Sequence, residues 1–468
     1  MPDIRLAVAL GAAKLTAMLI RRLGRGGGTA APGLIAQRLD SRLIAKLVMR
    51  LPDGVIVVAG TNGKTTTARM LADMLQASEK TVVHNRSGSN LVRGVAAALA
   101  AQSSVWGNPR ASIGLFETDE AAFGEVVRLS RPRVILLNNL FRDQLDRYGE
   151  LNTIATQWRA ALERLPATST VMVNVDDPTL AEISSGLTAE RVGFGLHQST
   201  HRLDALPHGA DAAICRRCGN ELAYDALYLS HLGEWRCPSC GNARPTLDVT
   251  GGDIELHGVE SLRLTISGPS DRTAANLHVG VPGLYNAYNA VAAVAVARVV
   301  GLEEATIREA LGEFQAAFGR IERVAYRDRS LTLALVKNPV GFNEVLRMLT
   351  GGGEALTVPT MIVINDLAAD GRDVSWLWDV DFEQLAKGTA PVVTAGLRGT
   401  DMANRLKYAG LPTERIVSLE TTLREALEQF VVALPAGGTG YILPTYTAML
   451  DLRRILTDLG AVEAFWRT

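Results

Sequence analysis

The sequence lacks several features that would assign it to a specialised class of protein. Its 468 residues include only four cysteines, aromatic residues make up 5%, and the formal net charge is -1. A net charge this close to zero argues against bulk electrostatic binding to nucleic acid or to an anionic surface. Hydrophobic residues account for 47% and charged residues for 21%, which is ordinary for a soluble globular protein. The chain is too long for one hydrophobic core, so we expect two or three domains.

The sequence also lacks a hydrophobic run long enough to span a bilayer. The opening stretch, Arg5–Ile20, is interrupted by Lys14 and followed by Arg21 and Arg22, so it is too short for a membrane span and ill-suited to a signal peptide. Residues 1–50 nevertheless hold nine Lys or Arg residues against two acidic residues. We expect a cytoplasmic protein with at most peripheral membrane contact. Its first helix either packs against the protein or presents a basic surface to the inner face of the membrane.

Short aliphatic segments alternate with helix-like segments from Gly54 onward. Such alternation predicts an α/β fold with a doubly wound, mainly parallel sheet. The expected strands of the first block are Val55–Ala59, Thr81–His84, Ala111–Phe116, Val134–Leu137 and Val171–Val175. The expected strands of a second α/β block are Leu331–Val336, Thr360–Ile364, Pro391–Ala395 and Gly440–Leu443.

Breaks in this pattern suggest the domain boundaries. Residues from about 202 to 250 interrupt the alternation with a cysteine-bearing insertion, and a long Ala/Val helix from Pro282 to Val300 resumes it. We expect a basic N-terminal segment over residues 1–50, a central domain over 51–322 and a C-terminal α/β domain over 323–468. The stretch Arg320–Arg329 would link the two domains.

The strongest chemical signal is a glycine-containing turn between an expected strand and an expected helix. It reads Gly60-Thr61-Asn62-Gly63-Lys64-Thr65-Thr66. Backbone N–H groups at such a turn bind phosphates, and the dipole of the following helix adds to the attraction. Lys64 would contact the β- and γ-phosphates of ATP, and the Thr65 hydroxyl would ligate Mg²⁺. The turn departs from the general P-loop pattern, because Val58 stands where that pattern has its first glycine.

This string resembles the P-loop of the Mur ligases and of folylpolyglutamate synthase. Those enzymes make an acyl phosphate from a carboxylate and ATP, and an amine then attacks it. Further segments match in the family's order: Leu115–Glu120, Asn138–Gly149, Asn174–Asp177, Gly283–Ala290 and Gly319–Glu322. By resemblance, Glu117 binds Mg²⁺ and Arg320 contacts phosphate. Asn286 and Asn289 lie, again by resemblance, on a helix that packs near the adenine.

Three departures from the pattern of the ordinary Mur ligases indicate which subfamily the sequence resembles. Gln144 stands where the family has a histidine, and Gln157 and Trp158 occupy the neighbourhood of a lysine that many Mur ligases carbamylate. The C-terminal Asp-Asn-Pro-Arg segment that selects an amino acid is also absent. An enzyme without that segment is suited to a smaller nucleophile, and ammonia fits. The segments Val336–Pro339, Asn365–Phe382 and Leu443–Met449 resemble the MurT family, whose ligase subunit pairs with a GatD-type glutaminase.

All four cysteines fall in one constellation. Cys215 and Cys218 form one Cys-x-x-Cys pair, Cys237 and Cys240 form a second, and a glycine follows each pair. This spacing predicts a four-cysteine zinc ribbon with a structural Zn²⁺, because four thiolates leave no open position for water. Disulfides, a catalytic zinc and a nucleic-acid-binding ribbon are weaker alternatives.

The cysteine count bears on the source of ammonia. Class I glutaminases use a cysteine thiolate as nucleophile, and zinc would occupy all four thiols of this chain. The resemblance implies amidation of the D-glutamate α-carboxylate of lipid II with ATP and Mg²⁺, using ammonia from a partner. The alternatives are a free-standing amino-acid ligase of the Mur or folylpolyglutamate type and a non-catalytic P-loop scaffold.

The acidic cluster after Gly371 is the expected contact with that partner. By resemblance, one aspartate of the ligase subunit completes a Cys-His triad on the glutaminase. The candidates are Asp379 first, because it directly follows Trp376 and Trp378, then Asp373, with Asp381 third. No histidine lies in a motif that suggests catalysis, and we expect His84, at a strand end, to be structural.

Overall fold

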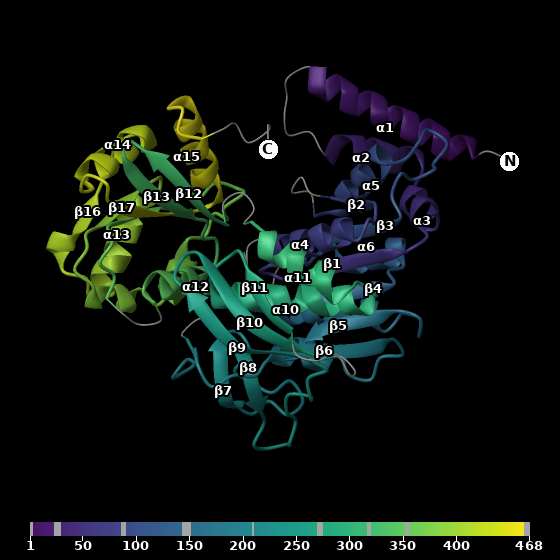
Figure 1. Ribbon diagram of the computed structural model, residues 1–468, viewed down its shortest axis with the longest axis horizontal. Coiled ribbons are helices and arrows are strands. Elements are labelled where there is room, and N and C mark those ends of the chain that lie inside the picture. Colours follow the sequence, from purple (N-terminus) through teal and green to yellow (C-terminus); the bar gives the residue numbers. More distant parts are fainter. Residues whose placement is uncertain are drawn as a thin grey trace.

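A computed structural model places the chain in two α/β domains with a small hairpin insertion (Figure 1). The described residues are 3–22, 30–85, 90–142, 151–207, 210–268, 275–315, 320–351 and 355–462, without the side chains of Arg21 and Arg320. Gln144, with the rest of 143–150, and Gly319 lie outside this description.

A nine-stranded sheet forms the centre of the first domain, in the order β11-β10-β9-β6-β5-β4-β1-β3-β2. Its strands are β1 (Val55–Ala59), β2 (Val82–His84), β3 (Ile113–Thr118), β4 (Val134–Leu137), β5 (Thr170–Asn174), β6 (Glu190–Leu196), β9 (Val249–His257), β10 (Ser261–Ser267) and β11 (Ala275–Val279). β1 to β6 and β9 pair in parallel, whereas β10 pairs antiparallel with β9 and β11. The expected α/β class is confirmed, and β9 to β11 add an edge that the sequence pattern did not reveal.

The side chains of β1 alternate between two apolar layers. Ile56 and Val58 face one layer, and Val55, Val57 and Ala59 face the other, because successive strand residues point to opposite faces. The first layer is covered by α4 (Lys64–Ala77), α10 (Leu284–Val299) and α11 (Glu304–Glu313). The second is covered by α1 (Ile4–Arg22), α2 (Ala30–Leu39), α3 (Leu43–Val48), α5 (Val92–Ala101), α6 (Phe123–Ser130), α8 (Leu151–Leu162) and α9 (Pro178–Ile183). The N-terminal segment therefore shares the core of the central domain.

The C-terminal domain is built on a six-stranded sheet in the order β12-β13-β17-β14-β15-β16. Its strands are β12 (Arg320–Tyr326), β13 (Arg329–Ala334), β14 (Thr360–Val363), β15 (Val392–Ala395), β16 (Ile416–Ser418) and β17 (Thr439–Pro444). Its helices are α12 (Pro339–Leu349), η1 (Ser375–Asp379), η2 (Phe382–Lys387), α13 (Gly399–Tyr408), η3 (Thr413–Arg415), α14 (Leu423–Ala433) and α15 (Tyr446–Asp458). One apolar layer packs under α14 and α15, and the other under α12, α13, η1 and η2.

The expectation that Arg320–Arg329 links the domains is wrong. Arg320–Tyr326 is the edge strand β12, which pairs antiparallel with β13. Arg327 and Asp328 form the turn between the strands with φ of 46° and 56°, a left-handed pair that suits a tight hairpin. The charged residues of this stretch lie on a sheet edge, where charge discourages edge-to-edge pairing.

The cysteine-bearing insertion is anchored to the central domain through Asp176. It contains the hairpin of β7 (Ala223–Leu229) and β8 (Leu232–Arg236), and Trp235 Nε1 donates to the carbonyl oxygen of Val175 over 3.0 Å. The fully buried Asp176 carboxylate receives Arg244 Nη1 at 2.8 Å and the hydroxyl of Tyr288 at 2.7 Å. Burial raises the pKa of Asp176, and the charge of Arg244 opposes that shift.

Replacing Arg244 by Met should therefore destabilise the fold. The variant leaves a buried carboxylate without its cation, which typically costs about 3–5 kcal/mol. Because burial raises the pKa of Asp176 above its unfolded value, the folded variant binds a proton more readily than the unfolded chain. The loss should be small at low pH and should grow as pH rises through the folded pKa. Urea unfolding of the variant and the wild type at acidic and neutral pH measures this loss of unfolding free energy.

Arg236→Met is the matched control for this prediction. Arg236 ends β8 in the same insertion, and its ion pair with Asp225 is exposed on both sides. Exposed pairs contribute about 0–1 kcal/mol, so this variant should unfold like the wild type. Equal stability of the two variants at neutral pH would show that Arg244 does not anchor the insertion.

Candidate active site

The glycine turn lies between β1 and α4, at the point where the strand order of the central sheet reverses. Such a switch point is where open α/β sheets bind ligands. Gly63 caps α4 with φ of 82°, and a Cβ there would lie 2.0 Å from Asn289 Oδ1. Gly60 has φ of 150°, and a Cβ there would lie 2.9 Å from the Cβ of Asn138. Both glycines are therefore required by conformation and by space.

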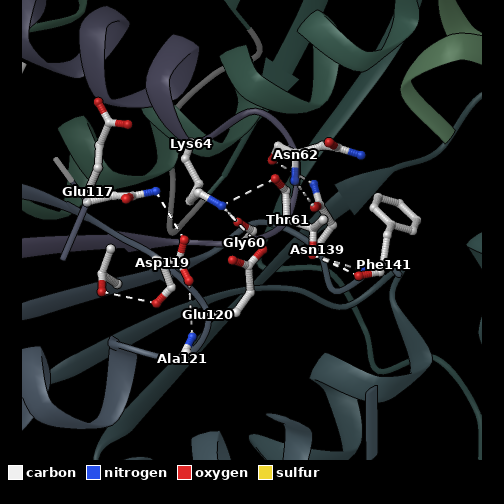
Figure 2. Close-up of polar contacts among 12 residues, drawn as sticks. Gly60, Thr61, Asn62, Lys64, Glu117, Asp119, Glu120, Ala121, Asn139 and Phe141 are labelled. Carbon is white, nitrogen blue, oxygen red and sulfur yellow. Dashed lines mark hydrogen bonds and ion pairs between the residues drawn. The ribbon is translucent and has the colours of Figure 1, made fainter. Parts of the chain in front are cut away.

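Lys64 lies inside the turn that it follows. Its ammonium donates to the carbonyl oxygen of Gly60, lies 3.3 Å from that of Thr61, and lies 3.3 Å from Glu120 Oε1 (Figure 2). Glu120, which the sequence did not single out, is held by Trp158, whose Nε1 donates to its backbone oxygen over 2.9 Å. The fully buried Trp158 thus supports the backbone of the lysine's carboxylate partner.

Thr65 and Glu117, the two residues predicted to bind Mg²⁺, lie beside each other. Thr65 Oγ1 donates to Glu117 Oε2 over 2.8 Å, and His84 Nε2 lies 3.2 Å from the other carboxylate oxygen. Asn85 makes two bonds to the backbone of Glu117, both of 2.9 Å. A hydroxyl beside a carboxylate fits Mg²⁺, which takes oxygen ligands and usually one or two carboxylates together with substrate phosphates. His84 orients Glu117, which agrees with a structural role.

Neutral amides hold the turn in place. Asn62 N donates to Asn139 Oδ1 over 2.8 Å, and Asn139 Nδ2 donates back to the Asn62 oxygen over 3.1 Å. Thr67 Oγ1 receives Asn138 Nδ2 at 3.0 Å and donates to Asn289 Oδ1 over 3.2 Å. Asn62 Nδ2 is buried and has no hydrogen-bond partner among the described residues, which leaves a donor for a bound phosphate or nucleotide.

Asn286 and Asn289 lie under the turn, on α10. Asn289 Nδ2 donates to Asn286 Oδ1 over 2.9 Å, and Asn286 Nδ2 donates to the carbonyl oxygen of Pro282 over 2.6 Å. Both side chains are buried, so the described contacts give them a supporting role, and contact with the adenine stays a prediction. The side chain of Arg320 lies outside the described residues, so its predicted phosphate contact is not addressed.

The C-terminal domain reaches the turn through Asn338. Asn338 Nδ2 donates to Asn62 Oδ1 over 3.0 Å, while its own Oδ1 caps α12 by accepting from Gly341 N over 2.8 Å. Pro339 follows at the first helical position, so Asn-Pro is a helix-start signal in the sequence. The N-terminus of α12, where a helix dipole favours negative charge, therefore lies beside the P-loop. Sequence reasoning found the Asn338 segment but not this contact.

The four cysteine sulfurs converge as predicted. Cys215 Sγ lies 3.7 Å from Cys240 Sγ, Cys218 Sγ lies 3.5 Å from Cys237 Sγ, and all four lie within 4.8 Å of one another. Four thiolates around one Zn²⁺ at about 2.3 Å would be about 3.8 Å apart. Gly219 and Gly241 follow the two pairs with φ of 77° and 71°. Both turns thus have the geometry of zinc knuckles.

The acidic residues after Gly371 have different surroundings. Asp379 Oδ2 lies 3.8 Å from Arg142 Nη2 of the central domain. Asp381 is bound reciprocally by Asn343 over 2.8 and 3.1 Å, which fixes it within the domain. Asp373 is exposed, and its bonds from Ser375 hold the pKa of its carboxyl below the usual range.

Comparison with known proteins matches both domains. A family model for the Mur ligase middle domain matches residues 58–214, and one for the MurT ligase C-terminal region matches residues 335–449. A subunit named lipid II isoglutaminyl synthase (glutamine-hydrolyzing) subunit MurT, from Streptococcus pneumoniae, is 33% identical over 466 residues, covering 98% of this chain and 99% of that one. Its namesake from Staphylococcus aureus is 29% identical and covers 95% and 96%. The chain belongs to the MurT family.

Solved structures agree on the fold. A pseudomurein peptide ligase type C from Methanothermus fervidus has a TM-score of 0.66 at 18% identity and covers 87% of this chain and 79% of that one. MurF ligase from Thermotoga maritima, in complex with ADP, has a TM-score of 0.62 at 13% identity and covers 91% and 84%. Members of the MurT family, this chain included, are ATP-dependent ligases with the Mur-ligase fold.

Lys64→Ala and Thr65→Ala should abolish ATP-dependent turnover while leaving the fold intact. Lys64→Ala removes a cation predicted to stabilise developing phosphate charge, and Thr65→Ala removes a predicted ligand of the Mg²⁺ that does the same. One such electrostatic contact supplies about 3 kcal/mol to a transition state. ATP consumption and product formation measure the effect, with thermal melting as the folding check. Thr65→Ser should retain activity because it keeps the hydroxyl. Lys80→Ala, which removes a lysine just beyond the far end of α4, should behave as wild type. Near-normal turnover by either alanine variant would refute the phosphate-binding assignment.

Metal analysis should find one Zn²⁺ per chain. Cys218→Ser and Cys240→Ser should lose the metal and lower stability more than they alter chemistry, because a structural zinc contributes on the order of 10 kcal/mol to local folding. Ser239→Ala, an exposed change inside the second knuckle, should keep both metal and stability. A fully active, stable preparation without metal would exclude a structural zinc.

Proposed function

We propose that this chain is the synthetase subunit of a lipid II amidating enzyme. It would convert the α-carboxylate of D-glutamate in the stem peptide to the amide, giving D-isoglutamine, with ammonia from a partner glutaminase of the GatD type. The name of the Streptococcus pneumoniae relative, lipid II isoglutaminyl synthase, supports lipid II as the substrate and the isoglutaminyl group as the product. The observation that carries the proposal is the P-loop, in which Lys64 and the Thr65–Glu117 pair lie together at the switch point of the sheet.

The reaction has two steps. The carboxylate attacks the γ-phosphorus of ATP, which gives an acyl phosphate and ADP. Ammonia then attacks the acyl carbon, phosphate leaves, and a proton is released as the amide forms. Lys64 and the N–H groups of the turn stabilise negative charge on the transferred phosphoryl group. Mg²⁺ held by Thr65 and Glu117 would neutralise part of that charge.

The cysteine cluster supports an external source of ammonia. All four cysteines of the chain converge on one site, where a zinc ion would occupy them. A glutaminase of the thiolate type needs a free cysteine nucleophile, so glutamine hydrolysis would take place on another chain.

The surface around Asp373 suits docking of that chain. Asp373 lines a cavity of about 520 Å³ together with Trp378, Arg405 and Tyr408. Trp378 and Tyr408 are both exposed and pack against each other with ring centroids 5.5 Å apart and ring planes tilted by 58°. Exposed aromatic side chains are common anchors of interfaces. Arg405 lies against the ring of Trp378 and donates to the carbonyl oxygen of Val380 over 2.7 Å. These contacts fix the segment that carries Trp378 against α13.

The geometry favours Asp373 over Asp379 as the triad aspartate. A carboxylate that orients a histidine of another chain must be accessible and ionised. Asp373 is exposed, and its lowered pKa keeps it ionised. Asp379 lies near the cation Arg142 and Asp381 is engaged by the Asn343 side chain, whereas the bond to Asp373 comes from Ser375, two residues along the same loop. This order reverses the sequence-based ranking, which rested on the position of Asp379 after the tryptophans.

The test supplies lipid II, ATP and one nitrogen source at a time. The purified chain should form amide with ammonium, and with glutamine only when the glutaminase is present. Mass spectrometry distinguishes the amide from an amino-acid adduct. An adduct with any amino acid would favour the free-standing ligase instead, and no turnover with any source would favour the scaffold.

With the glutaminase present, Asp373→Asn should lose glutamine-driven amidation by about the 10⁴-fold seen when a triad aspartate becomes an amide. Ammonium-driven amidation should survive, since the P-loop is untouched. Asp401→Asn, which lines the same cavity, should retain both activities. Loss of the glutamine-driven reaction in Asp379→Asn but not in Asp373→Asn would restore the sequence-based assignment.

A further inference from the structure

The first helix has two apolar faces, and only one of them is covered. Leu6, Leu10 and Ala13 are buried against the central domain, and α1 contacts α2 and α5. The opposite face is exposed and carries five large apolar residues, with exposed fractions from 40% to 71%. They are Ile4, Val8, Leu15, Met18 and Leu19. Their spacing of three, four or seven residues places them in one stripe. α1 lies along the outer edge of the molecule (Figure 1).

A second apolar element lies beside this helix. The loop after α5 exposes Val105 and Trp106, the latter to 62%. Arg50 Nη1 donates to the backbone oxygen of Trp106 over 2.9 Å, and a Cβ at Gly107 would lie 2.6 Å from Leu6 Cδ2. The loop is therefore packed against the N-terminal part of α1. Tryptophan is enriched where protein meets the interfacial region of a bilayer.

The charge around the stripe has one sign. No Asp or Glu occurs between Asp3 and Asp40. Arg5, Lys14, Arg21, Arg22, Arg25 and Arg38 occur in the same stretch. The two flanking acids are both bound by Lys46, at 2.7 and 2.5 Å. Burial and the neighbouring positive charge of Arg110 lower the pKa of Lys14. Arg110 therefore adds a further basic group beside the helix.

We propose that the exposed face of α1, with the Val105–Trp106 loop, docks on the surface of an anionic phospholipid bilayer. The helix lies in the plane of the interface, its apolar stripe enters the boundary between head groups and acyl chains, and its basic residues meet anionic lipid. Among the described residues, no helix is long and apolar enough to cross a membrane, so the contact is peripheral. A second copy of the chain fits poorly, because a two-fold interface would bring the basic flanks together.

Co-sedimentation of the full chain with vesicles tests this surface. The chain should sediment with vesicles that contain phosphatidylglycerol, and far less with vesicles of phosphatidylcholine alone. Binding should weaken as salt is raised, because salt screens exposed charges. The triple variant Val8→Ser/Leu15→Ser/Leu19→Ser should lower the partition coefficient about tenfold or more, since each buried methylene contributes to interfacial binding. Lys14→Gln with Arg22→Gln should lower it about tenfold on the anionic vesicles only.

Val417→Ser/Val432→Ser/Leu450→Ser is the matched control. These residues are exposed and apolar, lie in the C-terminal domain, and should leave vesicle binding unchanged. The proposal is overturned if the wild type stays in the supernatant with anionic vesicles, or if the α1 variant sediments like the wild type. It is also overturned if the α1 variant instead abolishes self-association in analytical ultracentrifugation or capture of the glutaminase. Vesicle binding uses neither ATP nor the amidation reaction, so its failure would leave the proposed function standing.

Discussion

The P-loop is held by neutral amides, and much of the molecule is arranged around that constraint. A phosphate-binding turn must keep its own N–H groups directed at the ligand, so its shape has to be fixed by other groups. Asn62 is bound by Asn139 on one side and by Asn338 on the other. Amides fix the backbone without adding charge. The electrostatic field at the site is therefore left to Lys64, Glu117 and Glu120.

Sequence reasoning predicted the parts of the fold whose signal is local. β1 and the glycine turn were predicted residue by residue, and the cysteine pairs were placed together correctly. Alternation of strands and helices does not predict β10, because an antiparallel edge strand follows its neighbour without an intervening helix. The alternation of Leu262, Leu264 and Ile266 with polar residues is the local signal for this strand. The expected link between the two α/β blocks is instead the edge strand β12, which a pattern built on βαβ alternation does not reveal.

Residues of the site that depend on distant contacts were the ones the sequence could not reveal. Glu120 is identified as a residue of the site only by its contacts, because Lys64 lies 3.3 Å away and Trp158 holds its backbone. Asn338 has the local sequence pattern of an ordinary helix cap, and nothing local indicates that its side-chain nitrogen donates to a loop 276 positions earlier. The aspartate ranking changed for the same reason. The tryptophan pair before Asp379 ranks it first in the sequence, whereas the proximity of Arg142, which lies more than 200 positions earlier, is visible only in the structure.

The cysteine-bearing insertion has a structural role beyond its predicted zinc site. It is bound to the central domain through Trp235, and Arg347 of α12 donates to the backbone oxygens of Tyr228 and His201 over 2.6 and 2.5 Å. The same helix carries Asn338 at its other end. The insertion therefore bridges both domains along α12. Moving α12 away from the P-loop would break the Asn338 contact and both Arg347 bonds together. A zinc ion that stiffened the insertion would therefore also favour the arrangement in which the N-terminus of α12 lies beside the P-loop.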